Sequence, residues 1–156
     1  MDFAEKNNIF CREQHGFRKQ RSCVSQLLGL IDEITHSRDK GKQTDMIVMD
    51  FAKAFDKVSH SLLTHKLQHY GITGNINNWI QSFLRDRRQA VVVDGATSTF
   101  VPVESGVPQG SVLGPCLFLL YINDLPKGLT STTRLFADDT ACHKIINKAA
   151  DQQELQ

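Results

Sequence analysis

Two apolar runs that end in carboxylates constrain this chain more than any other feature of its sequence. Residues 46–49 form an unbroken apolar run that suits a strand buried on both faces, and Asp50 follows it directly. Residues 135–137 form a second such run, which ends in Asp138 and Asp139. A carboxylate beside a buried strand is costly unless it is paired or bound to a cation. Three carboxylates at the ends of two short strands therefore indicate a divalent-metal site for phosphoryl chemistry.

The composition fits one globular domain rather than a specialised charged or membrane-spanning chain. The 156 residues are 40% apolar and 22% charged, which allows a core. A net charge of +1 argues against a strongly basic nucleic-acid binder. Neither a signal peptide nor a membrane-length apolar run is present, and none of the four cysteines forms a Cys-x-x-Cys pair. We therefore expect an intracellular, reduced protein without structural zinc.

Local patterns along the chain predict an α+β fold. We expect helices over residues 22–40, 59–70, 75–84 and 116–122, the first three capped by Ser22, Ser59 and Asn75, and strands over 46–49, 89–93, 97–103, 134–137 and 140–146. Asp94-Gly95 supplies the chemistry of a hairpin turn. The cleanest amphipathic pattern predicts a face toward the core, made of Ile76, Trp79, Ile80, Phe83 and Leu84.

Further polar and aromatic residues allow both a structural and a functional interpretation. Three glycines and two prolines between residues 106 and 115 predict a shaped loop, in which Gln109 either faces solvent or meets a ligand. Phe55 either packs in the core or belongs to the site. His65 and His69 have a spacing that can bind zinc, but the sequence offers no evident third ligand. Basic residues near Arg18 and Arg88 form either a solvated face or a phosphate contact.

Four segments, in this order, resemble the reverse transcriptases of non-LTR (LINE-like) retrotransposons, especially the jockey and CR1-like groups. They are residues 14–22, Met49-Asp50-Phe51-Ala52-Lys53-Ala54-Phe55-Asp56, residues 106–115, and Phe136-Ala137-Asp138-Asp139. Each is a modest signal, but the combination is highly specific and covers residues 2–146. The resemblance implies a right-hand polymerase palm with part of the fingers, in which an antiparallel sheet backed by helices brings Asp50 beside the Asp138-Asp139 hairpin.

The resemblance also implies a role for particular residues. Asp50 and Asp138 would bind two Mg²⁺ ions, with Mn²⁺ as an alternative, and Asp139 would support them. The carbonyl of Phe51 would complete a metal shell, and Phe55 would be a steric gate that rejects the 2′-hydroxyl of a ribonucleotide. Gln109 and Gly110 would lie beside the incoming nucleotide. Arg18 and Arg21 would contact nucleic acid. The implied partners are an RNA template, a DNA primer and deoxynucleoside triphosphates, with no membrane, and the implied locations are cytoplasm and nucleus.

The resemblance suggests a piece of a larger enzyme. Residues 1–44 would be a fingers-side segment, residues 45–146 the palm with the catalytic motifs, and residues 147–156 a truncated tail. The later palm motifs and the thumb of the family have no counterpart in the sequence. An alternative function is therefore a catalytically inactive relic or an RNA-binding fragment that keeps the palm fold. The sequence does not reveal the oligomeric state.

Overall fold

A computed structural model describes residues 1–155, which form two compact units. Unit 1 contains Met1–Ala52 together with the residues from Ile122 onward, and unit 2 contains Lys53–Tyr121. The three carboxylates singled out in the sequence all belong to unit 1. Among the described residues, none of the helices has both the length and the apolar character that crossing a bilayer requires.

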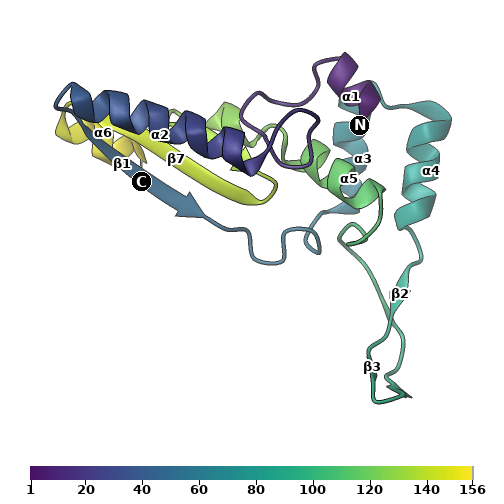
Figure 1. Ribbon diagram of the computed structural model, residues 1–156. Helices are drawn as coiled ribbons and strands as arrows, with labels where there is room; N and C mark the ends of the chain where they lie inside the picture. The colour runs from purple at the N-terminus through teal and green to yellow at the C-terminus, as the bar shows by residue number, and fades with distance from the viewer. Residues whose placement is uncertain (156) are drawn as a thin grey trace. The chain divides into compact units, whose positions relative to one another are not determined.

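Unit 1 is built on a three-stranded antiparallel sheet, shown in Figure 1. Its strands are β1 (Gln43–Met49), β6 (Thr132–Phe136) and β7 (Asp139–Ile146), in the order β1-β7-β6. The central strand β7 carries buried residues, and Leu135 of β6 is fully buried beside it. The hairpin predicted around Asp138 is confirmed, although β6 begins two residues earlier than expected and β7 starts at Asp139.

Helices pack against this sheet, as the prediction of a mixed α+β fold required. In Figure 1, α2 (Cys23–Asp39) lies along the sheet, and α6 (Ala149–Leu155) contacts β7 and β1. A capping box fixes the start of α2, because Ser22 accepts from the Ser25 amide while the Ser25 hydroxyl accepts from the Ser22 amide. The unit is completed by α1 (Asp2–Lys6) and the 3₁₀ helix η1 (Leu125–Gly128).

The burial expected for β1 is wrong, and α2 buries polar rather than apolar residues. Strand β1 is not buried on both faces, because Met46, Val48 and Met49 are 40–68% exposed. The strand lies at the edge of the sheet, where one neighbour is missing. In α2 the buried residues are Gln26 and Ser37, while its apolar residues Val24, Leu27, Leu28 and Ile31 are exposed.

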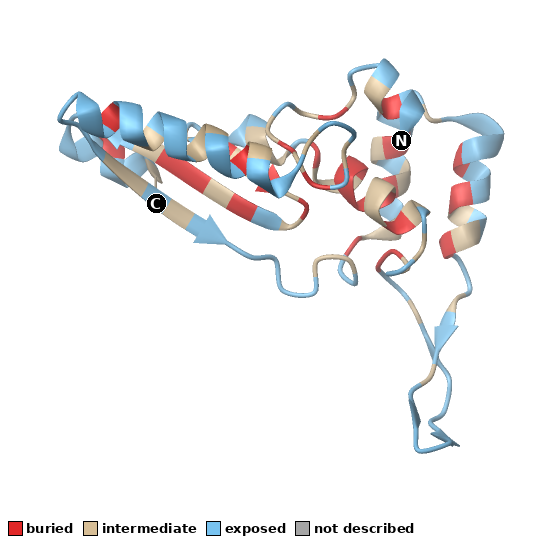
Figure 2. Ribbon diagram, in the orientation of Figure 1, coloured by how far each residue is buried: buried red, intermediate tan, exposed pale blue. Residues whose placement is uncertain are grey.

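Unit 2 combines three helices with a narrow β-ribbon. The helices are α3 (His60–His69), α4 (Gly74–Leu84) and α5 (Leu113–Ile122). Strands β2 (Arg88–Gln89) and β5 (Val101–Pro102) pair, as do β3 (Val92–Val93) and β4 (Ala96–Thr97), and we call residues 88–102 the ribbon. Figure 2 shows the ribbon as exposed and α5 as largely buried.

The sequence predicted the helices of unit 2 better than their burial. Ser59 caps α3 through the Leu62 amide, as expected. Helix α4 begins after Thr73 rather than after Asn75. Asn77 of this helix is buried, and its side-chain amide is satisfied because it donates to the carbonyls of Ile72 and Thr64. The predicted core face of α4 is only half correct, since Ile80 and Leu84 are buried while Ile76 and Trp79 are exposed.

Candidate catalytic site

The sheet of unit 1 brings Asp50 next to the tip of the β6–β7 hairpin. Met49 at the end of β1 pairs with Thr140 of β7. One further step in the same antiparallel register would place Asp50 opposite Asp139, although β1 itself ends at Met49. Backbone segments that lie almost ninety positions apart in the sequence therefore reach the same end of the sheet, because β1 and β7 are neighbours.

A two-residue connection carries the other carboxylate of this hairpin. Phe136 pairs with Asp139, so Ala137 and Asp138 alone form the turn. Ala137 has φ of +55°, in the left-handed region, where glycine is ordinarily preferred. Asp138 is half-buried and Asp139 is exposed. The turn thus presents two neighbouring carboxylates at a strand end.

The three carboxylates have no hydrogen-bond or ion-pair partner among residues 1–155. Their oxygens are the hard ligands that Mg²⁺ prefers, so the donor chemistry fits such an ion. Within the described part of the chain, however, no three His, Cys, Asp or Glu side chains are grouped so that they could hold a metal, and this includes His65 and His69. The backbone register thus supports the predicted cluster, but the side chains do not converge. Phe51, whose carbonyl was a predicted ligand, follows Asp50 and is partly exposed.

The second predicted group, around Phe55 and Gln109, lies within unit 2. The loop after residue 104 docks on residues 55–58 through two backbone hydrogen bonds and one from a side chain. The Val107 amide donates to the Phe55 carbonyl and the Gly106 amide to the Val58 carbonyl, both at 2.8 Å. The Ser105 hydroxyl donates to the Asp56 carbonyl at 2.7 Å. Gly106 is required here, because its φ is +91° and an added Cβ would lie 2.8 Å from the Asp56 backbone. These hydrogen bonds therefore join the segment that contains Phe55 to the loop that contains Gln109 within unit 2.

The side chains of this second group have specific surroundings. The Phe55 ring stacks on Phe118 with centroids 4.5 Å apart. Gln109 is exposed and its amide lies 3.5 Å from an Asp56 carboxylate oxygen, which is the long limit of a hydrogen bond. Gly110 has φ of +77° and open space around its Cα. Phe55 is thus half-buried against an aromatic partner, while Gln109 and Gly110 remain accessible to a ligand.

The arginines of the 11–21 loop differ in their availability. Arg18 is 10% exposed and donates to both oxygens of Glu5 and to the carbonyls of Cys11 and Gln14. These hydrogen bonds use the guanidinium inside the protein and hold the pKa of the Glu5 carboxyl below its usual range. Arg21 donates to the Arg12 carbonyl at 2.6 Å. The geometry favours a structural role for Arg18.

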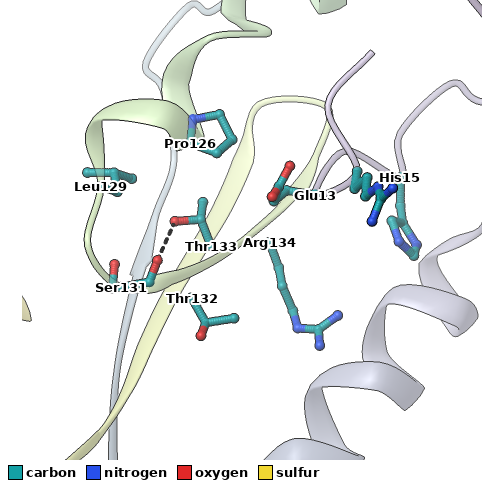
Figure 3. Close-up of a pocket in the computed structure, with 9 residues that line it drawn as sticks. Glu13, His15, Pro126, Leu129, Ser131, Thr132, Thr133 and Arg134 are labelled. Atoms are coloured by element: carbon teal, nitrogen blue, oxygen red, sulfur yellow. Dashed lines mark hydrogen bonds between the residues drawn. The ribbon is translucent and has the colours of Figure 1, made fainter. Parts of the chain in front are cut away.

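A polar pocket of about 340 Å³ lies between this loop and β6 (Figure 3). Glu13 and His15 line it from the loop, and Arg134 lines it from the strand. Arg134 also pairs with Glu33 at 2.7 Å. Burial, followed by the nearby Arg21 charge, lowers the pKa of His15. The pocket is polar, and Arg12, Glu13 and Arg134 bring charged side chains to its lining.

Sequence reasoning missed two residues that hold the candidate site in place. Gln14 is 2% exposed and its side-chain amide binds the backbone of Ala137. His60 bonds through Nε2 to the Gly106 carbonyl at 2.8 Å. Gln14 lies in one of the segments that carried the resemblance, but nothing in the local pattern indicated what its side chain would contact.

Comparisons with known proteins match most of the chain to one family. Residues 2–152 match the family model described as reverse transcriptase (RNA-dependent DNA polymerase). A probable RNA-directed DNA polymerase from transposon X-element of Drosophila melanogaster is 36% identical over 127 residues, which cover 81% of this chain and 14% of that protein.

Two further relatives come from the same organism. The RNA-directed DNA polymerase from mobile element jockey is 32% identical over 136 residues, covering 82% of this chain and 15% of that protein. A probable RNA-directed DNA polymerase from transposon BS is 34% identical over 131 residues, covering 80% of this chain and 14% of that protein. The chain thus spans about one seventh of the length of these relatives.

Proposed function

The chain belongs to the reverse transcriptase (RNA-dependent DNA polymerase) family, and we propose that it forms part of the palm of a retrotransposon polymerase that copies RNA into DNA. In this proposal residues 45–146 are palm with the catalytic motifs, residues 1–44 belong to the fingers side, and residues 147–156 are the tail. The reaction is attack of a primer 3′-hydroxyl on a deoxynucleoside triphosphate, with release of pyrophosphate.

The observation that carries the proposal is the register of β1 against β7. It supports a site in which Asp50 acts with Asp138 and Asp139, because the three residues share one end of the sheet. In the proposal Asp50, Asp138 and the Phe51 carbonyl hold two Mg²⁺ ions, or Mn²⁺ in their place, and Asp139 supports them. The ions would neutralise charge on the attacking and leaving oxygens.

The second group of residues would position the nucleotide. Phe55 would stack beneath the sugar and exclude a ribonucleotide 2′-hydroxyl, which separates ribo- from deoxyribonucleotides. Its stacking on Phe118 supports this role, since a gate must be rigid to exclude an added oxygen. Gln109 and Gly110, which are exposed, would meet the incoming nucleotide and template. Arg21 is the better candidate of the two loop arginines for a nucleic-acid contact, because Arg18 is engaged by Glu5.

Primer extension by a chimera tests the proposal. The matching segment of the jockey polymerase would be replaced by this chain, and incorporation of deoxynucleotides on an RNA template would be measured with Mg²⁺. We expect extension, and we expect Asp138→Asn to lower its rate roughly 100-fold or more, since weakening a metal site costs at least as much as losing an outer-shell partner.

Asp45→Asn in the same chimera is the matched control. Asp45 lies in β1 five residues before Asp50, and its carboxylate accepts from Gln43 and Gln152, away from the strand end. This variant should retain the rate of the unmodified chimera. A chimera that folds but incorporates no nucleotide with all three aspartates intact would contradict the polymerase proposal and favour the inactive-relic alternative. RNA binding by the 156-residue chain on its own, measured by filter retention, would identify an RNA-binding fragment.

A further inference from the structure

We propose that Gln14 is a positioning residue that holds the backbone of the turn presenting Asp138 and Asp139. The inference rests on the proposed function, because it assumes that these carboxylates bind the catalytic ions. Gln14 itself would touch neither ion nor substrate. It would act through Ala137, the residue that precedes both carboxylates.

The Gln14 side chain satisfies both backbone polar groups of Ala137. Its Oε1 accepts from the Ala137 amide at 2.8 Å, and its Nε2 donates to the Ala137 carbonyl at 3.1 Å. The same Oε1 also accepts from the Gly16 amide at 2.7 Å. All three contacts are buried. A side-chain amide thus replaces the backbone partner that a neighbouring strand would have supplied.

The conformation of Ala137 explains why such support is needed. A φ of +55° costs an alanine about 1 kcal/mol relative to glycine, so the turn is not the preferred local conformation. Thr140 Oγ1 makes one further side-chain bond to this turn, to the Asp138 carbonyl, at 3.5 Å. The adjacent carboxylates of Asp138 in the turn and Asp139 at the start of β7 also repel each other. Buried hydrogen bonds from Gln14 therefore hold a conformation that the local sequence disfavours.

The loop that carries Gln14 is fixed along β6. The His15 amide donates to the Leu135 carbonyl at 2.8 Å, and the Leu135 amide donates to the Glu13 carbonyl at 3.0 Å. Neighbouring side chains of an extended segment point to opposite sides. Glu13 and His15 accordingly line the pocket of Figure 3, whereas Gln14 reaches the turn. The backbone pairing thus sets the direction of the Gln14 amide.

The test compares Gln14→Met with Gln26→Met in the full 156-residue chain. Methionine has nearly the length of glutamine but cannot make these hydrogen bonds. Gln26 is also a buried glutamine of unit 1, in α2, and its Oε1 has no partner. Three quantities would be measured: the dissociation constant for Mn²⁺ by water-proton relaxation, hydrogen exchange of the Ala137 amide by NMR, and the thermal midpoint. Asp138→Asn identifies the Mn²⁺ signal that belongs to the carboxylates.

We expect Gln14→Met to weaken Mn²⁺ binding about 10- to 100-fold, as the loss of an outer-shell partner does. Gln14→Met should also accelerate hydrogen exchange of the Ala137 amide. Gln26→Met should change neither the Mn²⁺ affinity nor this exchange rate, even if it lowers the thermal midpoint. Adding Ala137→Gly to Gln14→Met should restore part of the Mn²⁺ affinity, because glycine adopts the positive φ without support. A purely structural role would not produce this rescue.

Two results would overturn the inference. In the first, Gln14→Met keeps the Mn²⁺ affinity of the unmodified chain. In the second, exchange of the Ala137 amide is the same in both proteins. If the unmodified chain binds no Mn²⁺ through its carboxylates, the proposed metal site is wrong, and the exchange measurement alone then decides whether Gln14 holds the turn. The two failures are therefore distinguishable.

Discussion

The two β-hairpins of this chain both have a positive φ at the first turn residue, but they hold it by different means. At the β6–β7 tip Ala137 has φ of +55°, and at the tip of the ribbon Asp94 has φ of +50°. Leu135 beside the first tip is fully buried, whereas every residue from 91 to 102 in the ribbon is exposed. The first hairpin is held by contacts from a distant loop, and the second contains its own turn chemistry.

The difference shows where a chain needs tertiary support for a turn. Asp94-Gly95 is a preferred pair for a hairpin whose two central residues both have positive φ, and Gly95 has φ of +81°. Ala137-Asp138 is not such a pair, and at this turn the Gln14 side chain forms hydrogen bonds with the Ala137 backbone. The conformation of this turn is therefore supported from outside the hairpin.

The two hairpins should differ most in the loss of unfolding free energy when a side chain of each is shortened, because the one in β6 is buried and the one in the ribbon is exposed. Leu135→Ala removes a fully buried side chain from β6 and should lower the free energy of unfolding by about 2–5 kcal/mol. Val92→Ala in the exposed ribbon should change it by less than about 0.5 kcal/mol. Urea unfolding measures both, followed by the amide signals of β7 for Leu135→Ala and by those of α4 for Val92→Ala. Equal losses would mean that the ribbon is buried in solution.

A smaller effect is expected where the supporting loop meets the turn. An added Cβ at Gly16 would lie 2.2 Å from the Ala137 nitrogen, so Gly16→Ala must move the loop or the turn. We expect a loss of about 1–3 kcal/mol in the free energy of unfolding, as for overpacking in a core. Gly128→Ala is the control, because nothing lies within 4 Å of its added Cβ. Similar values for the two variants would show that the loop is not docked on the turn.

This contrast also explains what the sequence could and could not predict. Elements with a local signal were predicted, among them the Ser22 and Ser59 caps and the Asp94-Gly95 turn. The place of Asp50 beside the β6–β7 hairpin was implied by the resemblance, and the register of β1 against β7 supports it, although the side chains do not converge. Gln14 was missed because its partner is 123 residues away and no periodic pattern encodes such a contact.

Burial was predicted less well than secondary structure, for a physical reason. Periodicity identifies which face of a helix is apolar, but burial depends on whether another element covers that face. Trp79 in α4 and Leu28 in α2 both follow the expected periodicity, yet both are exposed in this chain. Val48 in β1 is exposed for the same reason, since a strand at the edge of a small sheet is covered incompletely.

The ion pair that anchors the supporting loop should give a pH-dependent effect of about 1 kcal/mol. Arg18 lowers the pKa of Glu5, so the pair stabilises the protein fully above the ordinary glutamate pKa of about 4.3 and loses this effect as pH falls through the lower folded value. Glu5→Gln should therefore be less stable than the unmodified chain at pH 7, and the difference should shrink below about pH 4.

Urea unfolding from pH 7 to pH 3 measures this difference. The exposed pair of Lys19 with Asp2 provides the control, because both side chains are about 70% exposed and Asp2→Asn should have no measurable effect at pH 7. A Glu5→Gln difference that stays constant down to pH 3 would mean that Arg18 does not discriminate between the charged and neutral carboxyl, and that the loop is anchored by its backbone contacts alone.

The smallest effect on global stability is expected at the tip of the ribbon. Gly95→Ala places a side chain at φ of +81°, which disfavours the turn by about 1 kcal/mol. Because the ribbon buries almost nothing, we expect this cost to appear as local fraying, with a change below about 0.5 kcal/mol in global unfolding. NMR contacts between Val92 and Thr97, which pair across β3 and β4, should weaken while β7 signals stay unchanged. A loss above about 1 kcal/mol in the free energy of global unfolding would show that the ribbon unfolds together with the rest of unit 2. The two hairpins would then differ only in how their turns are held.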